Sequence, residues 1–171
     1  KEETIERIKK GIELLSKYIY KDYELEVVYT DDNILDPNIV DIIKRYNLII
    51  ISDEIYEAFC YEEYYSIAMS EEIRNNIIYI GGFSKMFSIT GIRIGFIAAN
   101  SEIINEIGKV HQYNVSCTNS IGQYGVLSGL KYGLYNIVNM KEEFMKRKAY
   151  VEDRLRNMNI EFISPKGAFY I

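Results

Sequence analysis

The chain has 171 residues, of which 48% are hydrophobic and 26% charged, a composition typical of a globular domain with a real core. Its net charge of −5 disfavours a nucleic-acid-binding face, which is usually basic. No apolar run reaches the ~20 residues that a membrane-spanning helix needs. The single His111 and the widely separated Cys60 and Cys117 indicate neither a metal site nor a disulfide framework. Because no apolar signal region opens the sequence, we expect a cytoplasmic protein that binds neither nucleic acid nor membranes.

Residues 1–35 form a first segment, a helix and its connection, to which the sequence assigns no function. Isoleucine and leucine recur at spacings of three and four over residues 5–19, which predicts an amphipathic helix. Packing on the rest of the domain and binding of a partner are both open interpretations of this helix. Residues 24–29 are expected to form a short strand.

Three apolar runs predict a sheet in the next part of the chain. Residues 47–52 and 76–80 are short aliphatic runs of the kind found in parallel strands that are buried on both faces. The residues between them are numerous enough for a parallel crossover. The third run, residues 92–99, begins a handful of residues after Lys85, so it is expected to be antiparallel to its predecessor.

Helical periodicity fills most of the remaining sequence. The expected helices cover residues 38–46, 101–110, 120–132 and 134–158, with Ser101 as a cap, and residues 160–163 and 168–171 are expected to be strands. Strands that alternate with helices predict an α/β fold with a mostly parallel sheet, one antiparallel strand and helices on both faces.

Two charged residues follow the predicted parallel strands. Asp53 comes directly after the first strand, and Lys85 lies a few residues after the second. Ligands of open α/β sheets bind at the carboxyl ends of the strands, so the two side chains are expected to meet in one crevice. Tyr56 and Arg93 are placed to join them, and arginine suits phosphate because of its planar fork of donors. Taken singly, each residue also has a structural explanation: a cap, a packed tyrosine, a solvated lysine or a surface ion pair.

The combination of these residues is more specific than any one of them. It consists of S-D-E-I-Y at 52–56, G-F-S-K at 82–85 and T-G-I-R-I-G-F at 90–96. Together these motifs closely resemble the class I/II aminotransferases of pyridoxal 5′-phosphate (PLP) fold type I. The sequence S-P-K-G-A-F-Y at 164–170 resembles the segment with which these enzymes enter their small domain. The resemblance implies that residues 36–158 are a portion of the PLP-binding large domain and that 159–171 begin a truncated small domain.

The family pattern implies a role for each residue of the motifs. Lys85 would bind PLP covalently and move a proton at the α-carbon of the substrate. Asp53 would pair with the pyridine nitrogen, and Tyr56 would hydrogen-bond the phenolic oxygen of the ring. Arg93 would bind the phosphate, with Ser84 as a hydroxyl donor to it.

The resemblance also implies an activity, which is transfer of an amino group from an amino acid to a 2-oxo acid by a homodimer of the aspartate or aromatic subgroup. Another fold-type I activity, such as a lyase or decarboxylase, and a non-catalytic PLP-binding domain are the alternatives, because they share the cofactor motifs. The sequence departs from the family at Gly82, where a serine or threonine is frequent. It also lacks an N-P-T-G turn and a late arginine for the substrate carboxylate, so it resembles part of such an enzyme.

Overall fold

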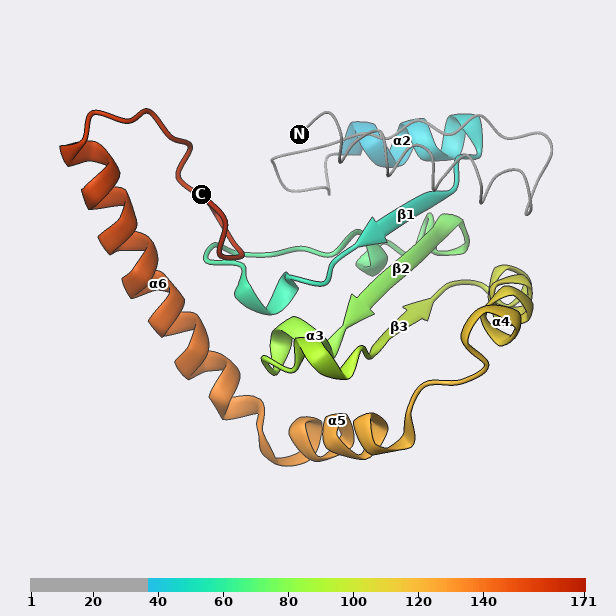
Figure 1. Cartoon of the computed structure of the whole chain (residues 1–171). Coiled ribbons are helices and arrows are strands. Elements are labelled where there is room, and N and C mark those ends of the chain that lie inside the picture. The colour runs from blue at the N-terminus through green and yellow to red at the C-terminus, as the bar shows by residue number, and fades with distance from the viewer. Residues whose placement is uncertain (1–36) are drawn as a thin grey trace. The chain divides into compact units, whose positions relative to one another are not determined.

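The computed structural model describes residues 37–171, so the helix and strand expected within residues 1–35 lie outside the described part of the chain. Figure 1 shows the helices and strands that follow. They are α2 (Pro37–Tyr46), β1 (Ile50–Asp53), β2 (Ile77–Gly82), α3 (Phe83–Met86), β3 (Gly95–Ala98), α4 (Ser101–Val115), α5 (Ser120–Tyr132) and α6 (Leu134–Asn157). Helices and strands alternate along the chain, which confirms the α/β class.

The strands β1, β2 and β3 lie side by side in sequence order (Figure 1). β1 pairs with β2 in parallel, with Asp53 opposite Ile80, and β2 pairs with β3 antiparallel, with Gly82 opposite Gly95. The predicted antiparallel strand is confirmed, because the short connection after Lys85 is too short for a crossover. The connection from β1 to β2 contains short 3₁₀ helices instead of a long crossover helix: Glu57–Phe59, Ile67–Met69 and Arg74–Asn76.

A cluster of isoleucines joins α2, the β1–β2 connection and the sheet. Its buried members are Ile43, Ile67, Ile73 and Ile77, and partly buried residues of α2, β1 and β2 pack against them. Burial of each such side chain contributes roughly 1.5–3 kcal/mol. This cluster fixes the start of both parallel strands, and it therefore sets the position at which each strand ends.

The prediction that β1 is buried on both faces was wrong. Successive residues of a strand point to opposite faces of the sheet. Ile50 packs against the isoleucine cluster and Ser52 is buried, whereas Ile51 between them keeps 42% of its surface exposed. Within residues 37–171 the cluster covers only the face of β1 that carries Ile50. An aliphatic run in the sequence therefore did not mean that both faces of this strand are covered.

The first two helices after the sheet, α4 and α5, begin at asparagine caps. The Asn100 side chain accepts a hydrogen bond from the Ile103 amide at 3.0 Å, so Asn100, and not Ser101 as predicted, caps α4. In the same way Asn119 accepts from the Gly122 amide at 2.6 Å and caps α5, whose bounds agree with the prediction. α4 continues five residues beyond its predicted end at residue 110, to Val115.

The two strands predicted at the end of the chain are absent from the described residues. The last segment instead forms an isolated bridge between Gly167 and Cys60. The Tyr61 amide donates to the Lys166 carbonyl at 2.8 Å, and the Ala168 amide donates to the Phe59 carbonyl at 3.0 Å. β-propensity alone does not make a strand, because the ladder needs a partner of matching length, and the loop at residues 59–61 offers only a short one.

Candidate active site

Lys85 lies in α3, the short helix that begins where β2 ends. Its side chain is half-buried, and its Nζ is 5.5 Å from the centre of the Tyr56 ring and 5.6 Å from the centre of the Phe169 ring. Within residues 37–171, no carboxylate forms an ion pair with this amine. The two rings interact with its charge through their faces, at about 0.5–1 kcal/mol for each partly exposed contact. The two ring contacts therefore position the Lys85 amine.

Asp53 and Tyr56 come from the end of β1 and the turn that follows. Asp53 Oδ1 accepts a hydrogen bond from the Ile55 amide at 3.3 Å. Burial raises the pKa of Tyr56 to about 12, and the hydrogen bond to Tyr170 and the negative charge of Asp53 add to this. Tyr56 therefore remains protonated near neutral pH. Lys85, Tyr56 and Asp53 thus lie in one region at the strand ends.

Ser84 and Arg93 form their hydrogen bonds away from Lys85, Tyr56 and Asp53. Ser84 is buried, and its hydroxyl donates to the Ile94 carbonyl at 3.4 Å. The Arg93 guanidinium is exposed and donates to the Thr90 carbonyl at 3.1 Å. Within the described residues, no hydrogen bond or ion pair joins either side chain to Lys85, Asp53 or Tyr56. Both face the connection that leads into β3.

The backbone of Arg93 is strained. Its φ of 56° lies in the left-handed region, which a non-glycine residue occupies at a cost of about 1–3 kcal/mol. Such residues gather at functional sites, where the surrounding structure holds them in place. The left-handed turn at Arg93 ends the 3₁₀ helix Thr90–Ile92 and directs the chain into β3.

Glu54 is a residue of the site region that sequence reasoning missed. It is only 5% exposed, and its carboxylate accepts hydrogen bonds from Ser52 Oγ at 2.8 Å, from Ser66 Oγ at 2.9 Å and from the Tyr64 hydroxyl. A buried carboxylate is stable only when its oxygens are satisfied in this way. Glu54 therefore fixes the turn between Asp53 and Tyr56. The S-D-E-I-Y motif contained it, but the motif gave no sign that its carboxylate points inward.

The glycine at position 82 has a steric explanation. A β-carbon there would lie 2.9 Å from Cδ1 of Ile55, which is closer than real β-carbons approach. Ile55 belongs to the turn that carries Asp53 and Tyr56. Because Gly82 has no side chain, this turn can pack directly on the end of β2 beside α3.

Two further aromatic residues, Phe169 and Tyr170, were also missed. The centres of the Phe169 and Tyr56 rings are 5.5 Å apart, and the rings meet in an edge-to-face arrangement. The Tyr170 hydroxyl is 2.6 Å from the Tyr56 hydroxyl, at hydrogen-bonding distance. The motif at residues 164–170 was recognised in the sequence, but no linear pattern indicated that its aromatic residues return to Lys85.

Residues 36–171 match the profile of the family described as aminotransferase class I and II. The chain belongs to this family. Its curated relatives include the probable N-acetyl-LL-diaminopimelate aminotransferase of Bacillus subtilis, 44% identical over 135 residues, which cover 78% of this chain and 34% of the relative. The aspartate aminotransferase of Thermotoga maritima is 36% identical over 134 residues, covering 78% of this chain and 35% of that protein.

Solved aminotransferase structures share the fold of the chain. The aromatic aminotransferase of Pyrococcus horikoshii superposes with a TM-score of 0.73 at 38% identity, covering 77% of this chain and 36% of that one. The aspartate aminotransferase of Thermotoga maritima gives a TM-score of 0.71 at 36% identity, covering 77% of this chain and 35% of that one. The chain therefore has the aminotransferase fold, PLP fold type I, and spans about 35% of the length of such relatives.

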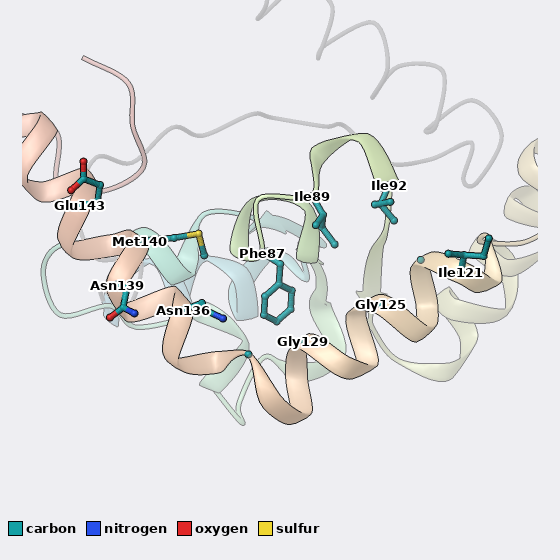
Figure 2. A pocket seen from close by; sticks show the side chains of 12 residues that line it. Phe87, Ile89, Ile92, Ile121, Gly125, Gly129, Asn136, Asn139, Met140 and Glu143 are labelled. Carbon is teal, nitrogen blue, oxygen red and sulfur yellow. The ribbon is translucent and has the colours of Figure 1, made fainter.

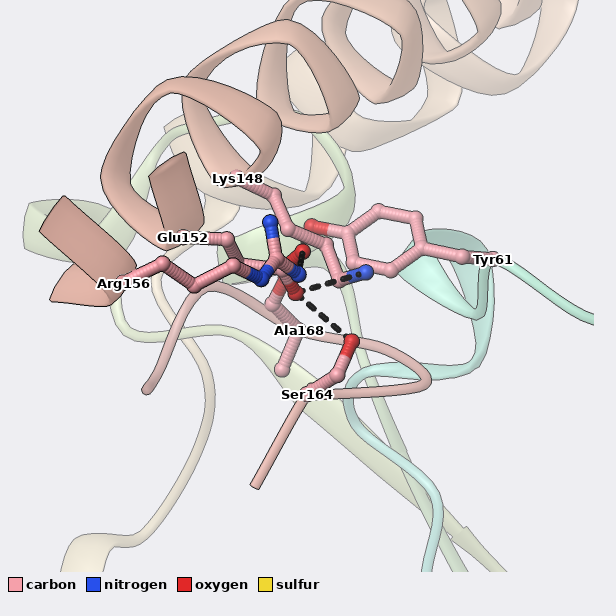
Figure 3. Close-up of polar contacts among 6 residues, drawn as sticks. All are labelled: Tyr61, Lys148, Glu152, Arg156, Ser164 and Ala168. Atoms are coloured by element: carbon pink, nitrogen blue, oxygen red, sulfur yellow. Dashed lines mark hydrogen bonds and ion pairs between the residues drawn. The ribbon is translucent and has the colours of Figure 1, made fainter. Parts of the chain in front are cut away.

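A cluster around Glu152 ties the C-terminal segment of this aminotransferase chain to α6 (Figure 3). Glu152 accepts a hydrogen bond from Ser164 Oγ at 2.6 Å and pairs with Lys148 and Arg156 at 3.0 Å each. The Lys148 amine also lies 5.9 Å from the centre of the Tyr61 ring. One carboxylate thus links the helix, the segment after it and the loop against which that segment packs.

This cluster predicts a pH-dependent stability. The hydrogen bond from Ser164, followed by that from Lys148, lowers the pKa of Glu152 from 4.5 to about 2. A carboxyl whose folded pKa is depressed stabilises the fold above its unfolded pKa, and this contribution is lost as the pH falls toward the folded value. We expect Glu152→Gln to lower the free energy of unfolding at neutral pH, and the difference from wild type to shrink between about pH 4.5 and pH 2.

Denaturant unfolding at a series of pH values measures this difference. Glu142→Gln, an exposed position on the same helix, is the matched control and should leave the unfolding free energy unchanged. A difference between Glu152→Gln and wild type that stays constant down to pH 2 would show that the charge of Glu152 does not hold the segment.

A cavity of about 680 Å³ lies between α5, the start of α6 and the residues that follow α3 (Figure 2). The glycines of α5 form one side of it, and Phe87, Asn136 and Met140 contribute side chains. None of the five residues predicted to bind or react with PLP lines this cavity. Its lining also contains no lysine or arginine, so it is not suited to a phosphate.

Within residues 37–171, no helix combines the length and the apolar character that crossing a bilayer requires. In the same residues, no group of three or more histidine, cysteine, aspartate or glutamate side chains is placed to hold a metal ion. Cys60 and Cys117 are free thiols.

Proposed function

We propose that this protein transfers an amino group from an amino acid to a 2-oxo acid with PLP as cofactor. The observation that carries the proposal is the Lys85 amine, which lies at the end of a parallel strand beside Tyr56 and Phe169 and has no carboxylate partner within residues 37–171. Membership of the aminotransferase class I and II family supports the same reaction. The substrates named for relatives are aspartate, aromatic amino acids and N-acetyl-LL-diaminopimelate. We propose a substrate from this range.

The residues near Lys85 fit the requirements of PLP. When bound, PLP supplies an electron-withdrawing ring that stabilises negative charge at the α-carbon of the substrate. The neutral amine of Lys85 would be the nucleophile that holds the cofactor, and once released it would carry a proton to and from that carbon. The carboxylate of Asp53 would pair with the ring nitrogen, and the protonated hydroxyl of Tyr56 would donate to the ring oxygen.

The buried carboxylate of Glu54 stabilises the turn that carries Asp53 and Tyr56. Its three hydroxyl partners hold the turn in which Asp53 and Tyr56 are three residues apart. A reactive group must be held within a fraction of an ångström to act efficiently. We therefore assign to Glu54 the role of keeping Asp53 and Tyr56 in place while the ligand binds.

Arg93 and Ser84 are the proposed phosphate ligands. Both lie close in sequence to Lys85, and Arg93 has an exposed guanidinium that can exchange the neutral Thr90 carbonyl for a charged phosphate oxygen. A charge-assisted hydrogen bond is roughly twice as strong as a neutral one, so this exchange is favourable. The strained backbone of Arg93 is consistent with a functional demand at this position.

We propose that the protein acts as a homodimer in the cytoplasm. Large hydrophobic side chains are exposed on α4 and α5, with Tyr113 at 93%, Ile121 at 83% and Tyr124 at 75%. Aromatic side chains such as the two tyrosines are enriched at protein interfaces. The two free thiols fit a reducing compartment.

Product analysis tests the proposed function. The intact protein is incubated with PLP, a set of amino donors that includes aspartate and aromatic amino acids, and a 2-oxo acid. We expect a new amino acid and the 2-oxo acid of the donor to form in equal amounts. Release of carbon dioxide or ammonia without this exchange would replace the aminotransferase assignment with a decarboxylase or lyase, and PLP binding without any product would indicate a non-catalytic domain.

A further inference from the structure

The C-terminal segment approaches the β1–β2 connection closely at one residue, Gly167. A β-carbon there would lie 3.2 Å from both Cα of Cys60 and the carbonyl oxygen of Phe59. This distance is tighter than most real contacts, so glycine is the residue that best permits it. The backbone of the segment can therefore pair with the backbone of residues 59–61.

The segment then turns sharply at Ala168. Its φ of 57° is left-handed, which is unfavourable for alanine. The turn is held on both sides, because the Ala168 amide donates to the Phe59 carbonyl at 3.0 Å and the Ala168 carbonyl accepts from the Tyr61 hydroxyl. Phe169 and Tyr170 follow directly, so this strained turn sets where the two aromatic side chains lie.

Tyr170 and Tyr56 meet through both their rings and their hydroxyls. The ring centres are 5.7 Å apart at an interplanar angle of 82°, and the two oxygens are 2.6 Å apart. Each phenol has one hydrogen to donate and can also accept. One of the two hydrogens lies between the oxygens, and the other is free for a different acceptor.

The direction of this hydrogen bond decides what Tyr56 can do. If Tyr56 donates to Tyr170, its hydrogen is used and cannot reach a ligand beside Lys85. If Tyr170 donates to Tyr56, the Tyr56 hydrogen is free, and the bond that its oxygen accepts makes it a stronger donor. A ligand with an acceptor oxygen therefore favours the arrangement in which Tyr170 donates to Tyr56 and Tyr56 donates to the ligand.

We propose that Tyr170 is a positioning residue for the reaction: its hydroxyl donates to the Tyr56 oxygen and so directs the Tyr56 hydroxyl at the ring oxygen of PLP. This inference rests on the proposed function, because it assigns to Tyr170 an effect on a PLP-bound site. Tyr170 acts through Tyr56 and touches neither the substrate nor the cofactor in this scheme.

The test is the pH midpoint at which the visible absorption band of bound PLP changes, measured on the intact protein. Tyr170→Phe keeps the ring that packs on Tyr56 and Phe169 and removes only the hydroxyl. The ring oxygen becomes more basic when the Tyr56 hydroxyl that donates to it becomes a weaker donor. We therefore expect the midpoint to rise by about 0.5–1 pH unit, the equivalent of one neutral hydrogen bond. Tyr150→Phe removes a hydroxyl from a side chain on α6 that is 68% exposed and should leave the midpoint unchanged.

A double-mutant cycle shows whether Tyr170 acts through Tyr56. Tyr56→Phe should raise the midpoint further than Tyr170→Phe, and the double variant should match Tyr56→Phe alone. A midpoint in Tyr170→Phe equal to that of wild type would overturn the inference, and so would shifts that add in the double variant. If the wild-type protein gives no PLP band, the proposed function fails and this inference fails with it, whereas a normal band with an unmoved midpoint removes the inference alone.

Discussion

Lys85→Ala is expected to yield a folded protein that no longer binds PLP covalently and has almost no aminotransferase activity. The amine at position 85 is the proposed attachment point and the group that moves a proton at the α-carbon. Loss of a positioned acid–base group alone lowers the rate by about 10²–10⁴-fold. The fold should survive, because the side chain is half-buried and its described contacts are the two ring faces of Tyr56 and Phe169.

Two further variants separate the roles of charge and nucleophile at this position. Lys85→Arg keeps a cation beside the two rings but has no neutral amine at physiological pH, so it should lose the visible PLP band as completely as alanine does. Lys131→Ala, near the end of α5, removes a lysine outside the site and should keep both the band and the activity. A band of wild-type strength in Lys85→Ala would mean that another amine holds the cofactor.

Asp53→Asn is expected to have the second largest effect, a loss of roughly 10- to 150-fold in kcat/KM. Asparagine retains an oxygen that can accept from the Ile55 amide, so the turn after β1 should persist. It removes the negative charge, and with it the ionic hydrogen bond that would keep the pyridine nitrogen protonated. A hydrogen bond to a charged group contributes about 1.5–3 kcal/mol, which corresponds to this range of rates.

Steady-state kinetics with a fixed amino donor measures this loss. Asp41→Asn, an exposed carboxylate on α2, is the matched control and should leave kcat/KM unchanged. Asp53→Asn should also ease the ionisation of Tyr56, because the charge of Asp53 contributes to the raised pKa of that residue. Wild-type kinetics in Asp53→Asn would exclude pairing between this carboxylate and the cofactor ring.

The residues whose positions follow from local pattern were predictable from the sequence. Asp53 and Lys85 come after strands that the apolar runs located, and the parallel pairing of β1 with β2 brings those strand ends to one edge of the sheet. The antiparallel β3 followed from the short connection after Lys85. The extent of α5 followed from its periodicity and from the polar residues before it.

The residues that depend on tertiary contact were not predictable. Phe169 and Tyr170 reach Lys85 and Tyr56 only because Gly167 packs on Cys60 and Ala168 adopts a left-handed turn. The same contacts explain why the last residues are not strands, since their partner is a short loop. The inward carboxylate of Glu54 was equally hidden, because its donors include Ser66, twelve residues further along the chain.

The attachment of PLP to Lys85 is tested most directly by reduction and mapping. The intact protein is mixed with PLP, treated with borohydride to convert the linkage to a stable secondary amine, and digested for mass spectrometry. We predict a single phosphopyridoxyl group on the peptide that contains Lys85. Modification of other lysines, such as Lys109 or Lys131, with Lys85 left unmodified would contradict the assignment.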